Sequence, residues 1–405
     1  MNQLSRYPDD IKPVWFANAR VVLPDRIFRG YVAVQGGKIL EVGLGDPAAQ
    51  GAQVVDLNGL YLAPGFIELH TYGAGGFDYM DGTVEAMCKA SQTHFEHGTT
   101  TLCPTTLAAS FEEIVRAMDA FRAAADTYTD GPALHGLHME GPYLNPMHKG
   151  AIDEKYIRNP DPAEYDEILK RNHASIARWT LAPELPGAPE FIRRLRQEGI
   201  LPSMGHSNAE YSQILEAYAA GSTHLTHMYS CMSTIVRRGG FRYPGLIESP
   251  FLIDGLTVEL IADGCHVPPE MLRMVYKLLG PDRVALTCDS IRCAGQDVAE
   301  AIIGSTENGY RVLIEDGVAK LSDRSAFAGS IATDDRLVRV MHQQAGVPLH
   351  DCVRMMSLTP AKILGIDRIT GSIAPGKQAD LVCFDDNIAV KGVRTARCGR
   401  LGLLA

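Results

Sequence analysis

Residues 201–230, LPSMGHSNAEYSQILEAYAAGSTHLTHMYS, contain two short apolar segments of the kind that form buried strands. The first segment ends near His206 and the second near His227, and EYSQILEAYAAG between them has the periodicity of an amphipathic helix. A strand, a helix and a second strand in this order build a parallel sheet. We therefore expect His206 and His227 at the same edge of that sheet, at the carboxyl ends of their strands.

The same alternation extends over most of the chain, which predicts an α/β fold. Eight apolar segments interleave with helical ones, and this number favours a closed, TIM-like (β/α)8 barrel over an open doubly wound sheet. No GxGxxG motif opens a helix and no GxxxxGK[ST] occurs, which argues against a nucleotide-binding fold. The barrel is expected to occupy residues 61–369. The candidate strands are residues 62–70, 99–106, 134–140, 177–184, 201–207, 222–230, 257–264 and 283–290.

The two ends of the chain show a different pattern, with short alternating segments and glycine turns. GYVAVQGGKILEVG near the beginning and GSIAPGKQADLVCFDD near the end are examples. This pattern predicts a small β-sandwich domain assembled from residues 1–60 and 370–405. The alternative is two unrelated edge strands.

The composition excludes several classes of protein. The 405 residues are 46% apolar and 21% charged, as in globular proteins with a sizeable core. The formal net charge of -10 argues against a nucleic-acid partner. The N-terminal MNQLSRYPDD has no signal-like apolar run, and no apolar stretch approaches about 18 residues, so we expect a cytoplasmic protein without a membrane partner. Nine scattered cysteines without a C-x-x-C pair indicate reduced thiols.

Residues that can bind metals stand at five of the predicted strand ends. They are His70, Glu140, His206, His227 and Asp289. In a barrel these ends meet on one face, where such proteins place their active sites. A carboxylate and several imidazoles there suit a divalent ion such as zinc, with an open position for water.

Two further histidines receive a structural interpretation. His138 shares the face of Glu140, two residues away on the same strand, and is expected to fill the barrel. His224 lies three residues before His227, and the alternation of a strand places it on the opposite face, packed outward.

Several short motifs, taken in order, resemble the N-acetylglucosamine-6-phosphate deacetylase family of the amidohydrolase superfamily. They are HMEGP at 138–142, GHS at 205–207, THMYS at 226–230, RYPG at 242–245, ADGCHV at 262–267, LTCDS at 286–290 and AGS at 328–330. The resemblance implies a homodimeric, metal-dependent enzyme. Its expected reaction is hydrolysis of the N-acetyl amide of N-acetylglucosamine 6-phosphate, or a close analogue, to acetate and the amino sugar phosphate.

The resemblance also implies a role for each matched residue. Glu140, His206 and His227 are the expected ligands of one divalent ion, with His70 as a further candidate, and Asp289 is the expected catalytic base. Zinc is the expected metal, and iron, manganese, cobalt and nickel are alternatives. The expected substrate contacts are Ala151, Ile152, Ser230, Cys231, Arg242, His266, Ala328, Gly329 and Ser330.

Four positions depart from the family pattern. The H-x-H motif of many relatives reads His-Thr-Tyr at residues 70–72, which favours a single metal because a neutral tyrosine is a poor ligand. Ile152 replaces the histidine of a K-G-x-H loop and cannot donate a hydrogen bond, and His148 is the candidate replacement. Ser230 stands in place of an asparagine, and Ser290 in place of an alanine.

These departures leave alternatives open. The chain is either the expected deacetylase, an amidohydrolase of another N-acyl or cyclic amide compound, or a catalytically silent homologue. Arg237 and Arg238, close to Arg242, are either a solvated pair in a loop or part of an anion site.

Overall fold

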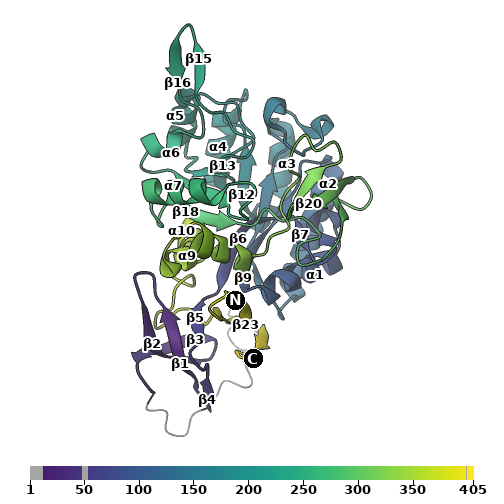
Figure 1. The fold of residues 1–405 in the computed structure, drawn as a ribbon. Coiled ribbons are helices and arrows are strands. Elements are labelled where there is room, and N and C mark those ends of the chain that lie inside the picture. The colour runs from purple at the N-terminus through teal and green to yellow at the C-terminus, as the bar shows by residue number, and fades with distance from the viewer. Residues whose placement is uncertain (1–11, 48–52, 398) are drawn as a thin grey trace.

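The computed structural model describes residues 12–47, 53–397 and 399–405, so the N-terminal MNQLSRYPDD and Cys398 lie outside the described residues. Eight parallel strands follow one another around a barrel, and a bridge between Thr71 and Ser290 joins the last strand to the first (Figure 1). The predicted barrel is therefore confirmed. Its strands are β6 (Phe66–Thr71), β9 (Thr99–Thr106), β11 (Leu137–Glu140), β12 (Ile176–Leu181), β13 (Leu201–Met204), β14 (His224–Leu225), β17 (Thr257–Ile261) and β18 (Val284–Thr287), with β10 (Ala133–Leu134) paired to β9.

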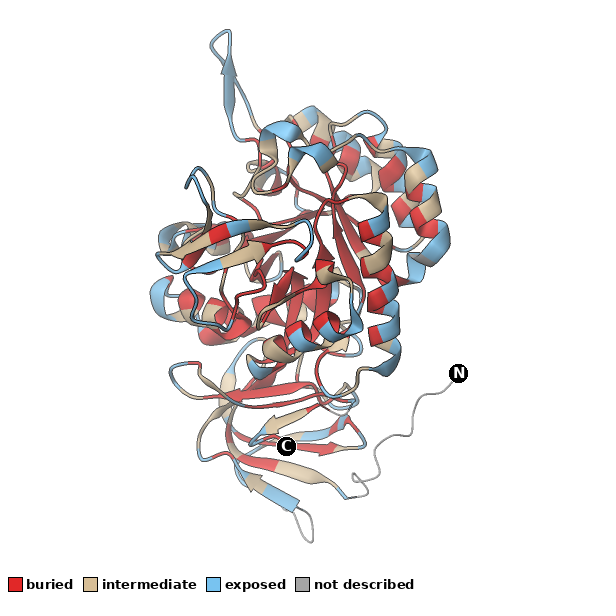
Figure 2. Cartoon of the chain, turned by 90° about the vertical axis from the view of Figure 1, so that its right-hand side faces the viewer, coloured by how far each residue is buried: buried red, intermediate tan, exposed pale blue. Residues whose placement is uncertain are grey.

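Helices cover the outside of the barrel, with buried faces towards the strands and exposed faces towards solvent (Figure 2). Helix α2 (Phe111–Thr127) shows why such segments fold in this way: Ser110 and Glu113 form a capping box at its start. Ile114, Ala117 and Phe121, spaced three and four residues apart, bury one face. The helices are α1 (Val84–Glu96), α2 (Phe111–Thr127), α3 (Pro162–Asn172), α4 (Ala188–Gln197), α5 (Tyr211–Ala220), α6 (Ser249–Leu252), α7 (Pro269–Leu279), α8 (Asp334–Arg339), α9 (Leu349–Met356) and α10 (Leu358–Ile363).

Short helical turns complete the chain. They are η1 (Tyr79–Asp81), η2 (Pro146–His148), η3 (Glu154–Tyr156), η4 (His173–Ser175) and the π-helical turn η5 (Val340–Gln344). Among the helices of the described residues, none is long and apolar enough to cross a membrane. The eight described cysteines are free thiols, as expected.

Strands from both ends of the chain form one eight-stranded sheet, which confirms the predicted β-domain and excludes two unrelated edge strands. Phe16, Val32, Leu62 and Leu381 are buried in its core. The sheet includes a strand that ends at Pro64, four residues beyond the expected boundary. Its strands are β1 (Val14–Val22), β2 (Ile27–Gln35), β3 (Lys38–Leu44), β4 (Gln53–Asp56), β5 (Tyr61–Pro64), β22 (Leu381–Phe384), β23 (Val390–Arg394) and β24 (Arg400–Gly402).

Three insertions decorate the barrel. A hairpin of β15 (Val236–Arg238) and β16 (Phe241–Tyr243) projects from the body of the molecule, and its strand residues are all exposed (Figure 1). A three-stranded antiparallel sheet follows the last barrel strand. The strands of this sheet are β19 (Glu300–Ile303), β20 (Tyr310–Glu315) and β21 (Val318–Leu321). The third insertion is a small hairpin of β7 (Gly73–Ala74) and β8 (Phe77–Asp78), which follows β6.

The barrel interior contains a buried polar network below the predicted site. Arg178 pairs with Glu259, and His224 Nε2 lies 2.7 Å from the same carboxylate. The expectation that His224 packs outward is therefore wrong. Its strand ends at Leu225, and His227 has a left-handed backbone (φ 35°), so the alternation that separates the two histidines is interrupted.

A second histidine of the barrel interior, His138, fills the barrel as expected. Its Nε2 lies 2.7 Å from the Thr180 hydroxyl and its Nδ1 lies 3.2 Å from the Thr105 hydroxyl. Both ring nitrogens are thus occupied by neighbouring side chains, which supports the structural interpretation over metal binding.

Candidate metal centre and active-site cavity

The backbone turns sharply after three of the four barrel strands that carry a candidate site residue. Glu140 is the last residue of β11, whereas His206, His227 and Asp289 each follow their strand by two residues. These three have positive φ angles of 48°, 35° and 50°. Such angles are unfavourable for residues with a Cβ and persist where the surroundings impose them, often at functional sites. The turns bring the four side chains together over the barrel mouth.

Three of the predicted ligands meet at one point. Glu140 Oε1 lies 3.2 Å from His206 Nε2 and 2.9 Å from His227 Nε2, and the two nitrogens are 3.1 Å apart. A tetrahedral zinc ion with bonds of about 2.0–2.1 Å separates its ligand atoms by about 3.3 Å. The observed spacing is close to this value, so the three side chains fit a metal ion with little movement.

The orientation of His206 supports the same conclusion. Its Nδ1 lies 2.7 Å from the backbone carbonyl of His148, which can only accept a hydrogen bond, so Nδ1 carries the proton. Burial opposes a charge on this ring, but Cys231 and Glu140 raise the pKa of His206 well above its ordinary value. A metal ion that displaces the Nε2 proton meets a lone pair facing Glu140 and His227. This second contact to a carbonyl is the usual way in which a protein orients a metal-binding histidine. Three acceptor atoms that face each other in a buried position are stabilised by a cation.

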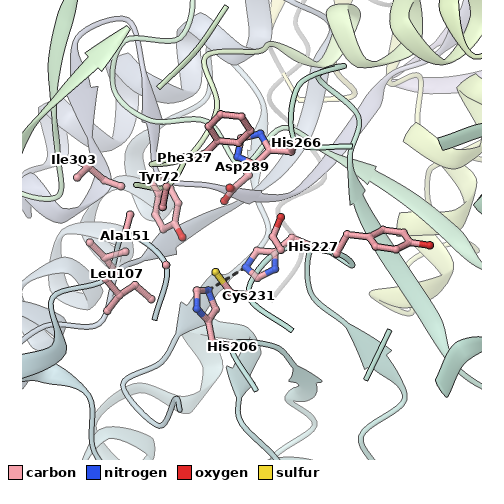
Figure 3. A pocket seen from close by; sticks show the side chains of 16 residues that line it. Tyr72, Leu107, Ala151, His206, His227, Cys231, His266, Asp289, Ile303 and Phe327 are labelled. Carbon is pink, nitrogen blue, oxygen red and sulfur yellow. Dashed lines mark hydrogen bonds between the residues drawn. The ribbon is translucent and has the colours of Figure 1, made fainter. Parts of the chain in front are cut away.

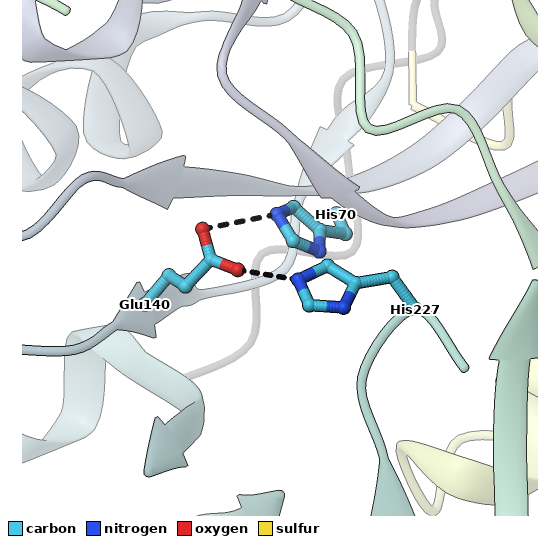
Figure 4. A group of neighbouring side chains, drawn as sticks. All are labelled: His70, Glu140 and His227. Carbon is cyan, nitrogen blue, oxygen red and sulfur yellow. Dashed lines mark hydrogen bonds and ion pairs between the residues drawn. The ribbon is translucent and has the colours of Figure 1, made fainter. Parts of the chain in front are cut away.

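The second oxygen of Glu140 has different partners. The hydroxyl of Tyr72 donates a hydrogen bond to Oε2. His70 Nε2 lies 3.4 Å from the same oxygen (Figure 4). His70 Nε2 also lies 3.1 Å from Asp289 Oδ1. Burial, with the charges of Glu140 and Asp289, raises the pKa of Tyr72 well above its ordinary value, so it remains a neutral donor. Tyr72 and His70 thus share Oε2, whereas His206 and His227 face Oε1.

His70 remains an alternative ligand by geometry. Its candidate ligand atom and those of Glu140 and His227 all lie within 4.8 Å of one another, and all three residues are buried. Figure 4 shows the His70 and His227 rings next to each other, each facing one oxygen of the Glu140 carboxylate. His70 thus lies between the metal-ligand carboxylate and the expected base.

The environment tunes the ionisation of two site residues. Burial raises the pKa of Asp289 to about 6, although the neighbouring His70 opposes the shift, and Glu140 adds to it. Burial lowers the pKa of His227 to about 4 despite its hydrogen bond to Glu140. A neutral His227 presents a nitrogen lone pair to a metal ion.

A cavity of about 250 Å³ opens directly above these residues (Figure 3). Besides the two metal-type histidines, Asp289 and Tyr72 contribute to its wall. His266 is held by Asp263, whose Oδ2 lies 2.8 Å from its Nδ1. The predicted substrate contacts that line the cavity are Ala151, Ile152, Ser230, Cys231, His266 and Gly329.

Three predicted contacts lie elsewhere. The backbone N–H of Ser330 donates to the carbonyl of Asp289 at 2.8 Å, so Ser330 holds the turn that carries Asp289. Ala328 is buried and its N–H donates to the carbonyl of Ala319. Arg242 is exposed on β16 and does not line the cavity of its own chain. The structure therefore does not bring these three residues into the cavity.

The candidate replacement for the missing histidine is also absent from the cavity wall. His148 turns its ring away, and its Nε2 lies 3.1 Å from Asn208 Oδ1. Ile152, in contrast, is buried and lines the cavity.

The sequence interpretation missed several residues of the cavity, among them three large apolar ones: Leu107, Ile303 and Phe327. Leu107 directly follows the predicted strand at 99–106, so its place at a strand end was a usable signal. Ile303 and Phe327 come from the inserted three-stranded sheet and the segment after it. No motif or periodicity indicates that this insertion folds back over the barrel mouth.

A second group of metal-type side chains lies outside the cavity, between the strands and the helices. His94, Cys288 and Asp334 are fully buried, with ligand atoms within 4.8 Å of one another. Thr99 donates a hydrogen bond to Asp334 at 2.5 Å. Burial and the neighbouring Glu68 raise the pKa of Asp334 well above its ordinary value, which favours a protonated carboxyl over a metal ligand. We interpret this group as a structural contact.

Comparisons with known proteins agree with this geometry. The model of the Amidohydrolase family matches residues 61–397. The N-acetylglucosamine-6-phosphate deacetylase of Lysinibacillus sphaericus is 32% identical, over 87% of this chain and 88% of the relative. The N-acetylgalactosamine-6-phosphate deacetylase of Escherichia coli is 30% identical, over 82% of this chain and 85% of the relative. The crystal structure of N-acetylglucosamine-6-phosphate deacetylase from Pasteurella multocida superposes with a TM-score of 0.88 at 30% identity, over 95% of this chain and 99% of that chain.

Proposed function

The chain belongs to the amidohydrolase family and, within it, to the N-acetylglucosamine-6-phosphate deacetylases, and we propose that it hydrolyses the N-acyl amide of an amino sugar 6-phosphate. The observation that supports this most strongly is the meeting of Glu140, His206 and His227 beside Asp289 at one cavity. Such a set is expected for metal-assisted hydrolysis and has no structural need to lie at a cavity.

We infer a single ion per subunit, held by Glu140, His206 and His227, with zinc as the expected metal. When bound, the ion lowers the pKa of water and polarises the amide carbonyl. Tyr72 supports the single-ion interpretation because its hydroxyl donates a hydrogen bond to Glu140 Oε2 and so engages an oxygen that a second ion would need. His70 then orients Asp289 instead of binding metal.

Asp289 moves the proton in the reaction. His70 Nε2 lies beside one carboxylate oxygen, Oδ1, which leaves the other for proton transfer. The carboxylate accepts a proton from the attacking water and delivers it to the nitrogen of the departing amine as the C–N bond breaks. A pKa near 6 suits both steps, because the group is mostly ionised at neutral pH yet returns the proton readily.

A phosphate group is most strongly bound by arginine or lysine side chains. Among the described residues that line it, none is a lysine or an arginine. The exposed β15–β16 hairpin carries Arg237 directly opposite Arg242 across its two strands. Two like charges in this position repel each other unless an anion lies between them. We propose a homodimer in which this hairpin reaches the cavity of the partner subunit.

The test is hydrolysis of N-acetylglucosamine 6-phosphate by metal-replete protein, with release of the free amine as the readout. N-acetylglucosamine without phosphate is the matched control, and it should react much more slowly. If the protein hydrolyses other amides rapidly but hydrolyses neither of these two sugars, a different substrate class is favoured.

A further inference from the structure

The proposed function leaves the size of the acyl group open. Resting on that function, we propose that the cavity accepts an acyl group longer than acetyl and that Leu107, Ile152 and Ile303 select it. These side chains come from three segments: the end of β9, the loop after η2, and the inserted strand β19. They are 8%, 3% and 2% exposed, and all line the cavity. Together they form an apolar wall.

The wall occupies one side of the cavity only. Figure 3 shows Leu107, Ala151 and Ile303 on the same side as the Tyr72 ring, whereas His227 lies across the cavity from them. The amide carbon must lie between the metal ligands and Asp289. Besides its oxygen, this carbon carries the acyl chain on one side and the nitrogen of the sugar on the other. A sugar carries hydroxyl groups that need hydrogen-bonding partners, and the three wall side chains offer none. The acyl chain therefore faces the wall, and the sugar faces the polar side.

A second, smaller cavity of about 30 Å³ lies behind the wall. Leu107 and Ile303 line both cavities, so these two side chains separate them. Met80, Ala108 and Ala109 extend the apolar lining of the smaller cavity, whose remaining lining includes polar residues such as Asn308. Removal of the Leu107 side chain would join the two spaces and lengthen the room for an acyl chain.

The expected gain follows from apolar burial. Each methylene that leaves water for the wall should raise kcat/KM about fourfold, until the chain meets Leu107 and Ile303. The substrates for the test are glucosamine 6-phosphates acylated with acetyl, propionyl or butyryl groups. The measurement is kcat/KM for amine release by the metal-replete protein.

In the wild-type chain we expect the propionyl or butyryl substrate to be about fourfold or more better than the acetyl one. Leu107→Ala should move the optimum to a longer chain. Ile302→Ala is the matched control, because this neighbouring isoleucine of β19 lines neither cavity. The wild-type series needs no variant, so the proposal stays testable if Leu107→Ala fails to fold.

Two contrary outcomes have different meanings. A steady fall in kcat/KM from acetyl to butyryl overturns the assignment of the wall to the acyl chain but leaves the deacetylase function intact. Failure of every acylated glucosamine 6-phosphate overturns the proposed function itself, and this proposal with it.

Discussion

The hydroxyl of Tyr72 donates a hydrogen bond to Oε2 of Glu140, while Oε1 of the same carboxylate faces His206 and His227. This division of the two oxygens supports the proposed single metal ion, because only one of them faces the proposed histidine ligands. The raised pKa of Tyr72 keeps the phenol protonated, so it acts as a donor and adds no ligand.

The first prediction concerns metal content. Purified protein should contain about one tightly bound divalent ion per chain, following the rule of three ligands and a water. Tyr72→His replaces the donor with an imidazole and should raise the content towards two equivalents, measured by elemental analysis. Two equivalents in the wild-type chain would contradict the single-ion account. In that case His70→Ala and His94→Ala would show which group holds the second ion.

The second prediction concerns the base. Asp289→Asn keeps the size of the side chain but removes the proton acceptor, so kcat should fall by on the order of a hundredfold or more. Metal content should stay near one equivalent, because Asp289 lies outside the three-ligand set. Near wild-type turnover in this variant would show that the base lies elsewhere, and His70 and His266 would be tested next.

Removal of the metal should lower the stability of the fold. An ion present at about a hundred times its Kd stabilises the folded state by about 2.7 kcal/mol. Treatment with a chelator should therefore lower the free energy of unfolding by a similar amount, measured by denaturant titration, and added zinc should restore it. His206→Ala should show the lower stability from the start and no response to zinc. If the stability of this variant responded to chelator and zinc in the same way as that of the wild type, the assignment of His206 as a ligand would be contradicted.

The position of Ile152 predicts the efficiency on the acetyl substrate. Loss of a donor at the carbonyl removes transition-state stabilisation of roughly 3 kcal/mol, so we expect weak activity on N-acetylglucosamine 6-phosphate. Ile152→His should raise kcat/KM on that substrate by up to about a hundredfold. A wild-type value of about 10^4 per molar per second or higher would show that another group supplies the donor.

The hairpin predicts a shared site. Arg242→Ala should raise KM for a phosphorylated substrate by about tenfold or more, because it removes a charged hydrogen bond, and should leave the unphosphorylated sugar unaffected. A mixture of Arg242→Ala and Asp289→Asn chains, refolded together, should recover activity if the hairpin acts on the partner subunit. No recovery in demonstrated mixed dimers would place Arg242 outside the site.

The sequence predicted the parts of the site that depend on strand ends. The expected positions of Glu140, His206 and His227 follow from where apolar strands stop, and the structure brings these residues together. Ile303 and Phe327 escaped prediction because their place depends on how an insertion packs over the barrel. His224 was assigned to the wrong face because strand alternation fails where the backbone turns at His227.

The rate of amine release from N-acylated glucosamine 6-phosphates, with and without the metal, tests the central claim most directly. The account predicts that metal-replete protein hydrolyses the propionyl or butyryl substrate more efficiently than the acetyl one. It also predicts that chelation abolishes the reaction and that added zinc restores it. Amine release that is unaffected by complete removal of the metal, or the absence of release from every member of the series, would contradict it.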